Sequence, residues 1–383
     1  MGNLPNKLQS KLDGRKVDGA LRSLPGPLAP IDFSSNDYLG LARNRELSQR
    51  TLEILDAAGP WNGSTGSRLL TGNHPLYHIV EEHLESWHRA EAALVFNSGY
   101  DANLGFFACV PQRGDLVLYD ELIHASIRDG IQMGRAQAYK YAHNGLGDLE
   151  RQWERLAKEK EGAEVYVVTE SLYSMDGDMP DLSALAQFCR EKGCHLVVDE
   201  AHATGIYGQG RDLVCELGLE EAVFARTITF GKAIGGHGAA LLGSLGLKEY
   251  MINFARPLIY TTALQPHTLA GILSAYRYLG KNAEDSLERL FGNIDHFRAE
   301  IVALGLSDFF VPSVSAVQSA LVPGNDRARE LAAKLREAGF DVRPILSPTV
   351  PQGKERLRFC LHAHNGDEEI SRILGLFKQW IHK

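Results

Sequence analysis

The sequence predicts an α/β protein whose main sheet is seven-stranded and mostly parallel, with a smaller C-terminal α/β domain. Two patterns predict this fold class. Short apolar runs alternate with helical segments along much of the chain. Most of these runs are continuous rather than alternating in hydrophobicity, as expected for strands that are buried on both faces of a sheet. The length of 383 residues exceeds what one hydrophobic core usually spans, so we expect more than one domain.

Seven apolar runs are the expected strands of the sheet, and they cover residues 92–96, 115–120, 138–142, 164–169, 195–199, 226–230 and 239–243. Between two of them lies a helical segment, 182–191, which directly follows Asp181, a residue suited to cap a helix N-terminus. Each of these strand and helix signals is local. Together they predict the strand–helix alternation of an open sheet.

The two ends of the chain differ from this pattern. Residues 1–45 are polar and contain Pro25, Pro27 and Pro30, which predicts a short helix followed by an extended arm. After about residue 284 we expect a long amphipathic helix, 286–304, and then a shorter β/α set that ends in a helix at 370–381. We therefore expect an N-terminal helix and arm (1–45), a large domain (46–285) and a small C-terminal domain (286–383).

Composition and charge exclude several classes of protein. Forty Lys plus Arg against 48 Asp plus Glu give a net charge of −8, which offers no electrostatic reason to bind nucleic acid. The most apolar stretch, 92–110, is interrupted by Asn97, Asp101 and Asn103, so it does not predict a membrane span. The N-terminus lacks the apolar core of a signal peptide. We expect a cytoplasmic protein that binds neither nucleic acid nor membranes.

The cysteine pattern predicts reduced thiols and no metal site. Five cysteines are scattered along the chain without a C-x-x-C pair, at Cys109, Cys189, Cys194, Cys215 and Cys360. An odd number of scattered cysteines is typical of a cytosolic protein without disulfides.

Polar residues stand just past several expected strands, where ligands of open α/β sheets bind. Ser98 and Gly99 separate a strand from a helix, and such a turn can offer N–H groups and a hydroxyl to an anion, although an ordinary tight turn is the alternative. Asp199 ends an apolar run, either as an acid in a cleft or as a helix cap or ion-pair partner. Lys232 follows another strand among small uncharged residues, where desolvation lowers the pKa of an amine and makes it nucleophilic. A surface lysine in a glycine loop is the alternative there.

Taken together, these residues match the requirements of pyridoxal phosphate (PLP). This cofactor needs a lysine for a Schiff base, a carboxylate for its ring nitrogen and phosphate donors at a helix start. Lys232, Asp199 and the Ser98–Gly99 turn supply that set, with Thr229 three residues before the lysine.

Short motifs in a fixed order then resemble the α-oxoamine synthases, a family of fold-type I PLP enzymes, over nearly the whole chain. The motifs are NDYLG at 36–40, GSTGSR at 63–68, HAS at 124–126, SMDGD at 174–178, DEAHATG at 199–205, TFGK at 229–232, LIYTT at 258–262 and PTVP at 348–351. The resemblance implies a fold-type I PLP-dependent transferase.

The resemblance also implies roles for individual residues. Lys232 would form the Schiff base and then take the Cα proton of the amino acid, Asp199 would pair with the ring nitrogen, and His124 would stack on the ring next to the substrate. Ser174 and His202 would form hydrogen bonds around the ring hydroxyl, with His202 also counted among the catalytic residues. The phosphate would be held by Ser98, Gly99, Tyr100, Thr229 and Thr262, the last from a partner subunit.

For the substrates, the resemblance implies that Arg358 and Asn36 bind the amino-acid carboxylate and that Arg22 and Thr349 contact the acyl substrate. One departure concerns this acyl end. Many close members carry Arg-Pro where this chain has Leu346 and Ser347, and Arg343 is a candidate replacement for the missing arginine.

Within the family, the chain is most similar to the members that join L-alanine to a pimeloyl thioester, carried on CoA or acyl carrier protein, in biotin biosynthesis. Those members imply a homodimer with shared active sites. Other family members remain as alternatives, namely 2-amino-3-ketobutyrate CoA ligase (glycine C-acetyltransferase) and serine palmitoyltransferase. An aminotransferase and a catalytically inactive scaffold homologue are further alternatives.

Overall fold

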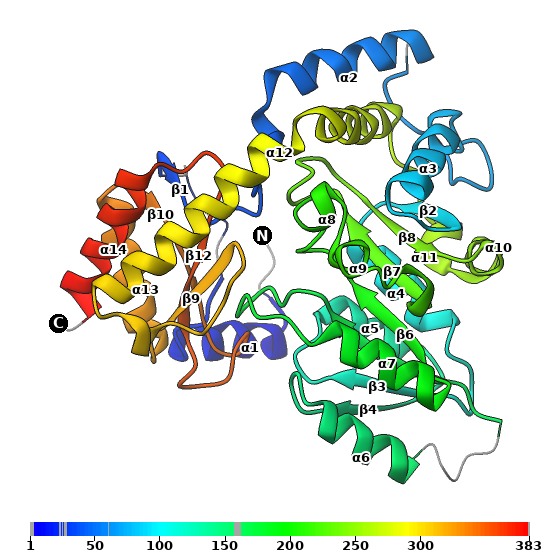
Figure 1. Ribbon diagram of the computed structural model, residues 1–383. Helices are drawn as coiled ribbons and strands as arrows, with labels where there is room; N and C mark the ends of the chain where they lie inside the picture. Colours follow the sequence, from blue (N-terminus) through cyan, green and yellow to red (C-terminus); the bar gives the residue numbers. More distant parts are fainter. Residues whose placement is uncertain are drawn as a thin grey trace. The chain divides into compact units, whose positions relative to one another are not determined.

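The computed structural model describes residues 4–22, 24, 26, 29–59, 61–156 and 162–381 (Figure 1). Internal contacts divide the chain into two compact units. The sheet unit comprises residues 39–173 and 179–287, and the terminal unit comprises residues 1–38, 174–178 and 288–383. Pro25 and Pro27 of the expected arm lie outside the described residues. The expected division into an N-terminal helix and arm, a large domain and a small domain stays a proposal.

The sheet unit is built on the expected seven-stranded sheet. Its strands are Ala92–Phe96 (β2), Leu116–Asp120 (β3), Gln137–Tyr141 (β4), Val165–Glu170 (β5), His195–Asp199 (β6), Ala225–Thr229 (β7) and Ala239–Gly243 (β8). Their order in the sheet is β2-β8-β7-β6-β5-β3-β4. Every predicted run forms a strand, with ends that differ by at most one residue, so the predicted fold class is confirmed.

The strand directions determine where a ligand site can form. Only β8 is antiparallel to its neighbours, β2 and β7, and the other neighbouring pairs are parallel. The carboxyl ends of β2, β3, β5, β6 and β7 therefore meet at one edge of the sheet. The segments that carry the predicted cofactor residues of this unit, apart from Thr262, follow these ends.

Helices make the sheet a buried layer. Every residue of β2 and β5 is buried, which explains their continuous hydrophobicity. On one face, Phe106, Phe107 and Met251 pack in a core cluster with side chains of the central strands. The helices of this unit are Arg45–Ala58 (α2), Leu76–Trp87 (α3), Gly99–Cys109 (α4), Ala125–Met133 (α5), Leu146–Leu156 (α6), Leu182–Lys192 (α7), Tyr207–Gly210 (α8), Leu213–Leu217 (α9), Leu245–Phe254 (α10) and Arg256–Ile259 (α11).

The expected cap of α7 is confirmed, because the Asp181 side chain accepts a hydrogen bond from the Ala184 N–H at 2.9 Å. The expected start of the long helix at residue 286 is wrong. One continuous helix, α12, covers Pro266–Ala303. Gly280 lies within this helix and against Trp87, where an added Cβ would come within 3.3 Å of the indole. Packing therefore accounts for this glycine inside a helix.

The terminal unit contains two small sheets. Val317–Leu321 (β9), Arg343–Ile345 (β11) and Arg356–Cys360 (β12) form an antiparallel sheet in the order β11-β12-β9. Ile31–Asp32 (β1) pairs in parallel with Phe340–Asp341 (β10). Three helices lie wholly in the terminal unit, namely Asn6–Val17 (α1), Asn325–Glu337 (α13) and Asp367–Ile381 (α14). They confirm the short N-terminal helix and the last helix expected from the sequence.

The core of the terminal unit is aromatic. Phe310, Phe359 and Phe377 pack with ring centroids 5.7–5.9 Å apart, and Phe297 joins them at similar distances. Within the part of the chain that the structure describes, no helix is both long and apolar enough to span a membrane.

Candidate active site

Lys232 lies on a loop that the backbone holds in a fixed shape. The loop follows β7 and is closed by hydrogen bonds between Phe230 and Gly238 (2.9 Å) and from the Gly235 N–H to the Lys232 carbonyl (2.8 Å). Gly235 has a φ of +67°, and an added Cβ would come within 2.4 Å of the Ala42 nitrogen. Only glycine fits there. The half-buried lysine is therefore presented at the carboxyl end of β7 by a rigid turn.

Asp199 ends β6 and is 6% exposed. Its Oδ1 accepts a hydrogen bond from the Ala201 N–H at 2.9 Å, and its Oδ2 accepts one from Asn103 Nδ2 at 2.7 Å. Both carboxylate oxygens are thus held by donors. The orientation of the acid that we predicted to face a ring nitrogen is fixed by these contacts.

His124 follows β3 and caps α5. Its Nδ1 lies 2.8 Å from Ser126 Oγ and accepts the Ser126 N–H at 3.3 Å. Partial burial of the imidazole lowers the pKa of His124, although the residue as a whole is exposed. Asp199 raises the same pKa and Lys232 lowers it, so both charges act on the imidazole. The structure therefore brings His124, Asp199 and Lys232 together.

The start of α4 is packed tightly against the end of β7. Ser98 caps this helix, because its Oγ accepts the Asp101 N–H at 3.0 Å and lies 2.8 Å from Asp101 Oδ2. A Cβ added at Gly99 would lie 2.6 Å from the Thr229 methyl group. The Ser98 hydroxyl is thus engaged in the cap with the Asp101 N–H, and the other N–H groups at the start of α4 are in position to face an anion.

Two other residues predicted to hold the phosphate lie on exposed segments of the sheet unit. The Tyr100 hydroxyl donates a hydrogen bond to Asp129. The carbonyl of Thr262 accepts a hydrogen bond from Asn97 Nδ2 at 2.8 Å, and the same amide contacts Thr261 Oγ1 at 3.3 Å. Asn97 thereby fixes the segment that carries Thr262 next to the turn that precedes α4.

The two residues predicted around the ring hydroxyl belong to different units. His202 is buried in the turns that follow β6, in the sheet unit. Ser174 is half-buried and belongs to the terminal unit. Their roles stay predictions.

In the terminal unit, three arginines share one face of the small antiparallel sheet. Arg358 on β12 is in register with Arg343 on β11 and with Ser319 on β9. Residues directly opposite each other point to the same face, and Arg356, two positions before Arg358, does so too. The other face carries Leu357 and Phe359, which are fully buried.

These arginines differ in their partners. Arg356 forms an ion pair with Asp176, and Arg343 forms one with Asp341 at 3.1 Å. Among the described residues no ion pair holds Arg358, and its buried Nε has no hydrogen-bond partner. Its guanidinium donates instead to the amide oxygen of Asn36 and contacts the thiol of Cys360 at 3.1 Å. Arg358 is thus a half-buried cation that still lacks an anion.

Asn36 is fixed by a network of its own. Its Oδ1 also accepts a hydrogen bond from the Tyr38 hydroxyl at 3.2 Å. The preceding residue, Ser35, contacts the buried ring of His362 at 3.1 Å. Arg358 and Asn36, predicted as a pair, are therefore brought together and held in place.

The two residues predicted to contact the acyl substrate also meet. Arg22 donates a hydrogen bond to Thr349 Oγ1 at 3.2 Å, and both residues are exposed. Arg343, the candidate replacement for the missing arginine, is engaged by Asp341 and leaves about a third of its side chain exposed.

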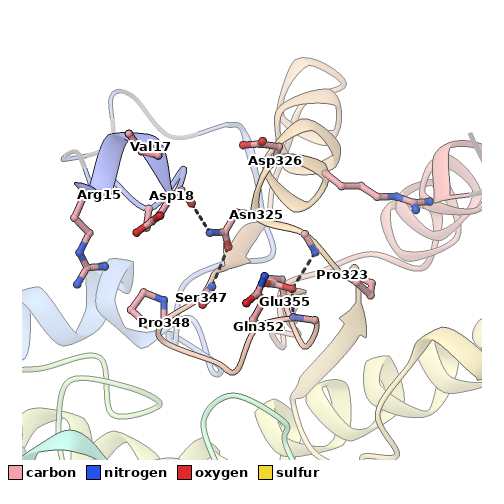
Figure 2. A pocket seen from close by; sticks show the side chains of 14 residues that line it. Arg15, Val17, Asp18, Pro323, Asn325, Asp326, Ser347, Pro348, Gln352 and Glu355 are labelled. Carbon is pink, nitrogen blue, oxygen red and sulfur yellow. Dashed lines mark hydrogen bonds between the residues drawn. The ribbon is translucent and has the colours of Figure 1, made fainter. Parts of the chain in front are cut away.

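A cavity of about 1060 Å³ lies beside Ser347 and Pro348 in the terminal unit (Figure 2). Asn325 bridges its walls, because its side chain donates to the Asp18 carbonyl and accepts from the Ser347 N–H, both at 2.9 Å. Charged side chains in the lining comprise two arginines and three acids: Arg15, Arg327, Asp18, Asp326 and Glu355. This lining does not form the basic surface that an acidic carrier protein needs.

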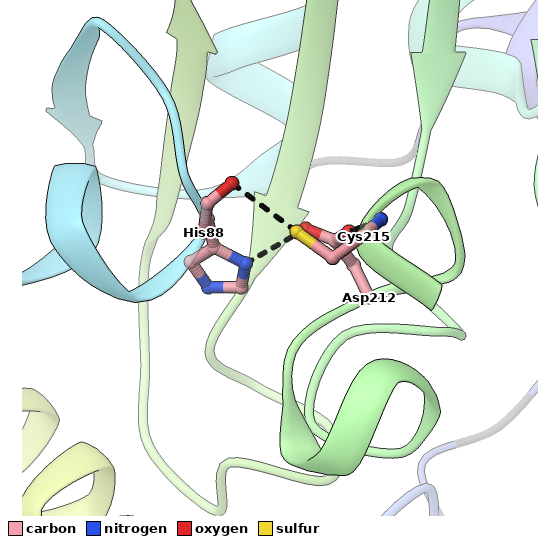
Figure 3. Close-up of side chains that lie close together, drawn as sticks. All are labelled: His88, Asp212 and Cys215. Carbon is pink, nitrogen blue, oxygen red and sulfur yellow. Dashed lines mark hydrogen bonds and ion pairs between the residues drawn. The ribbon is translucent and has the colours of Figure 1, made fainter. Parts of the chain in front are cut away.

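One buried cluster in the sheet unit has the composition of a metal site. His88, Asp212 and Cys215 place one ligand atom each within 4.8 Å of one another (Figure 3). The guanidinium of Arg226 contacts Asp212 at 3.0 Å and Cys215 Sγ at 3.4 Å. A guanidinium already neutralises the carboxylate, so the cluster is a buried ion pair with hydrogen-bonded neighbours rather than a cation site. None of the five cysteines is paired in a disulfide.

The structure adds two residues that the sequence did not single out. Asn103 on α4 and Ser126 on α5 are buried, and they connect Asp199 with His124. In the sequence Asn103 was noticeable only as a polar residue in an apolar run. A buried polar side chain needs a partner, so that interruption was the available signal.

The residues of the sheet unit fit PLP. They offer an amine at Lys232, a carboxylate at Asp199, and an exposed imidazole at His124. The observation that supports the fit is the packing of Gly99 on Thr229, which places the start of α4 directly beside the Thr229 side chain. A phosphorylated aromatic aldehyde requires this combination of groups.

Comparisons with known proteins agree with this chemistry. The family model for aminotransferase class I and II matches residues 29–376. The 8-amino-7-oxononanoate synthase of Emericella nidulans is 39% identical over 375 residues, which covers 93% of this chain and 90% of the relative. The crystal structure of 8-amino-7-oxononanoate synthase from Francisella tularensis is similar, with a TM-score of 0.76 and 28% identity over 92% of this chain and 98% of that one.

A structure of SPT with a PLP internal aldimine is also similar, with a TM-score of 0.87 and 28% identity over 98% of this chain and 96% of that one. The family model and the curated relative each cover most of the chain. The chain therefore belongs to the aminotransferase class I and II family, and within it to the family of the 8-amino-7-oxononanoate synthases.

Proposed function

We propose that this protein condenses L-alanine with a pimeloyl thioester and releases CO2 and the free thiol, which gives 8-amino-7-oxononanoate for biotin biosynthesis. The activity is that of a PLP-dependent acyltransferase. The observation that carries the proposal is the meeting of Lys232, Asp199 and His124 at one edge of the sheet, together with the tight packing of Gly99 on Thr229. The relative from Emericella nidulans, which is 39% identical to this chain, is named for this activity as an 8-amino-7-oxononanoate synthase.

When bound, PLP supplies an electron sink that makes bonds to the amino-acid Cα labile. Lys232 Nζ would be the amine that attaches the cofactor and the base for the Cα proton. Asp199 would pair with the ring nitrogen, because its carboxylate is fixed by two donors. His124 would cover the ring, and Ser174 and His202 would act at the ring hydroxyl.

Arg358 binds the carboxylate of the amino-acid substrate. Its Nε has no partner among the described residues, and a carboxylate can satisfy both this atom and the charge. Asn36 already contacts the same guanidinium and limits its orientation. The neighbouring pair of Arg22 and Thr349 contacts the acyl substrate.

Three further statements belong to the proposal. We place the protein in the cytoplasm. It acts as a homodimer, in which the partner subunit's Thr262 completes the phosphate site. Strongly exposed apolar side chains support an interface, with Leu70 80% and Tyr260 72% exposed. The thioester arrives on CoA or on acyl carrier protein, and the cavity lining described above offers no basic surface for the latter.

A substrate panel tests the reaction. L-alanine, glycine and L-serine are each combined with pimeloyl-CoA, pimeloyl-acyl carrier protein, acetyl-CoA and palmitoyl-CoA, and the aminoketone product is identified by mass spectrometry. We expect the highest kcat/KM for alanine with a pimeloyl thioester.

Other outcomes of the panel would favour the alternatives. Preferred turnover of glycine with acetyl-CoA would indicate a 2-amino-3-ketobutyrate CoA ligase, and serine with palmitoyl-CoA a serine palmitoyltransferase. Pyruvate released from alanine without any thioester would indicate an aminotransferase. An inactive scaffold homologue would give no product with any pair.

The packing at the phosphate end gives a mutational prediction. Gly99→Ala places a Cβ 2.6 Å from the methyl group of Thr229, a β-branched side chain that cannot easily move. Overpacking of this kind costs about 1–3 kcal/mol, so we expect the Kd for PLP to rise by about tenfold or more. Equilibrium titration of the apoprotein with PLP measures it.

Gly105 provides a matched control on the same helix. A Cβ added there would lie 3.4 Å or more from its nearest neighbours, which is ordinary contact. Gly105→Ala should therefore bind PLP as the unmodified protein does. Equal affinities for the two variants would mean that the start of α4 does not hold the phosphate.

A further inference from the structure

A continuous chain of hydrogen bonds joins the carboxylate of Asp199 to the imidazole of His124. Asn103 Nδ2 lies 2.7 Å from Asp199 Oδ2 and 3.0 Å from Ser126 Oγ. Ser126 Oγ lies 2.8 Å from His124 Nδ1. Asn103 is 3% exposed and Ser126 is fully buried, so water does not compete for these contacts. All four residues belong to the sheet unit.

The chemistry of the groups fixes where the protons lie. Asp199 accepts, so the nitrogen of the Asn103 amide must face it, and that nitrogen has two protons and no lone pair to offer. One proton goes to Asp199 and the other to Ser126 Oγ. The hydroxyl of Ser126, having accepted from Asn103, has one proton left, and this proton points to His124.

The backbone supports the same assignment. The Ser126 N–H donates to His124 Nδ1 at 3.3 Å in the cap of α5. Two donors therefore converge on Nδ1, which must be the unprotonated nitrogen of a neutral ring. The remaining ring proton lies on Nε2.

We propose that Asn103 and Ser126 are positioning residues that tie the Asp199 carboxylate to His124 and hold His124 as the neutral Nε2–H imidazole. This inference rests on the proposed function, in which His124 covers the ring whose nitrogen Asp199 keeps protonated. A neutral imidazole can stack on a cationic ring without charge repulsion, whereas an imidazolium ion would repel it.

The charged groups around His124 are consistent with a neutral ring. Burial lowers the pKa of His124, and Lys232 lowers it further. Asp199 and Asp129 act in the opposite direction. Hydrogen bonds donated to Nδ1 stabilise the neutral form, so they also favour a low pKa.

NMR of the apoprotein tests the tautomer without any need for bound cofactor or turnover. The protein is labelled with ¹⁵N in its histidines, and the His124 signals are assigned as those missing in His124→Gln. We expect an unprotonated Nδ1 and a protonated Nε2 in the unmodified protein. A protonated Nδ1 would overturn the proposal before any positioning variant is made.

Two variants test the connection. Ser126→Ala removes one donor to Nδ1, so we expect a mixture of tautomers and a rise in the His124 pKa of about half a unit to one unit. Asn103→Ala removes a donor to the Asp199 carboxylate, so we expect PLP to bind about 10–100-fold more weakly. The control is Ser274→Ala, which removes another fully buried hydroxyl, one that donates to the Leu47 carbonyl. It should change neither quantity.

Unchanged tautomer and pKa in Ser126→Ala, or unchanged PLP affinity in Asn103→Ala, would contradict the proposal. A failure of the proposed function looks different, because then the unmodified protein itself would neither bind PLP nor turn over alanine. The NMR result on His124 would stand in that case.

Discussion

Replacing Lys232 by alanine is expected to lower turnover of L-alanine and the pimeloyl thioester by a factor on the order of 10⁴ or more. In the proposed function, the variant lacks both the amine that would attach the cofactor and the base that would take the Cα proton. The loop should keep its shape, because it is closed by backbone hydrogen bonds and by packing at Gly235. Steady-state kinetics with both substrates measure the loss.

A covalent label identifies the amine independently of activity. Borohydride reduction of the unmodified holoprotein should fix PLP to the peptide that contains Lys232, and Lys232→Ala should take up no reduced label. Lys248 provides a control, because it is also partly buried but is engaged by Glu81 and Glu85. Lys248→Ala should keep the label and the activity. Label on any peptide that lacks Lys232 would contradict the role given to this lysine.

The sequence was sufficient to predict the sheet and the polar residues at its edge. Apolar runs buried on both faces, such as β5 and β6, are readable without knowledge of their neighbours. The carboxyl ends of parallel strands meet at one edge, so residues just past those ends are expected to converge. Asp199 and Lys232 were predicted on this basis, whereas His124 was predicted only from the family resemblance. Electrostatic interactions in the structure link all three residues.

Contacts between distant segments could not be predicted in the same way. Asn103 and Ser126 lie in two different helices, α4 and α5, and the sequence pattern of neither helix indicates a shared hydrogen bond. Only the family resemblance singled out Arg358, and what distinguishes it physically from Arg343 and Arg356, namely that these two have acids of their own, is visible only in the structure. The N-terminal part of α12 was also missed, because the sequence analysis started this helix at residue 286, whereas it begins at Pro266.

Replacing Arg358 by alanine is expected to lower kcat/KM for L-alanine by about 10²–10³-fold, because a buried charge pair with the substrate carboxylate is lost. Both KM and kcat should be affected. In the proposed function, Arg358 would orient the amino acid through its carboxylate, so an amino acid held less firmly would spend less time in the reactive orientation. Arg358→Lys should recover only part of the loss, since an ammonium group keeps the charge but not the planar fork.

Arg343 separates this role from a general effect of charge on the sheet face. It lies directly opposite Arg358 on the neighbouring strand, but Asp341 already neutralises it. Arg343→Ala should therefore leave the KM for alanine within about twofold, as is usual when a partly exposed ion pair is removed. Near-normal kinetics of Arg358→Ala, or an equal rise of the KM for alanine in both variants, would contradict this role. The unpartnered Nε of Arg358 would then bind an anion other than the alanine carboxylate. The amino acid would then need a different cation to orient the bond that breaks.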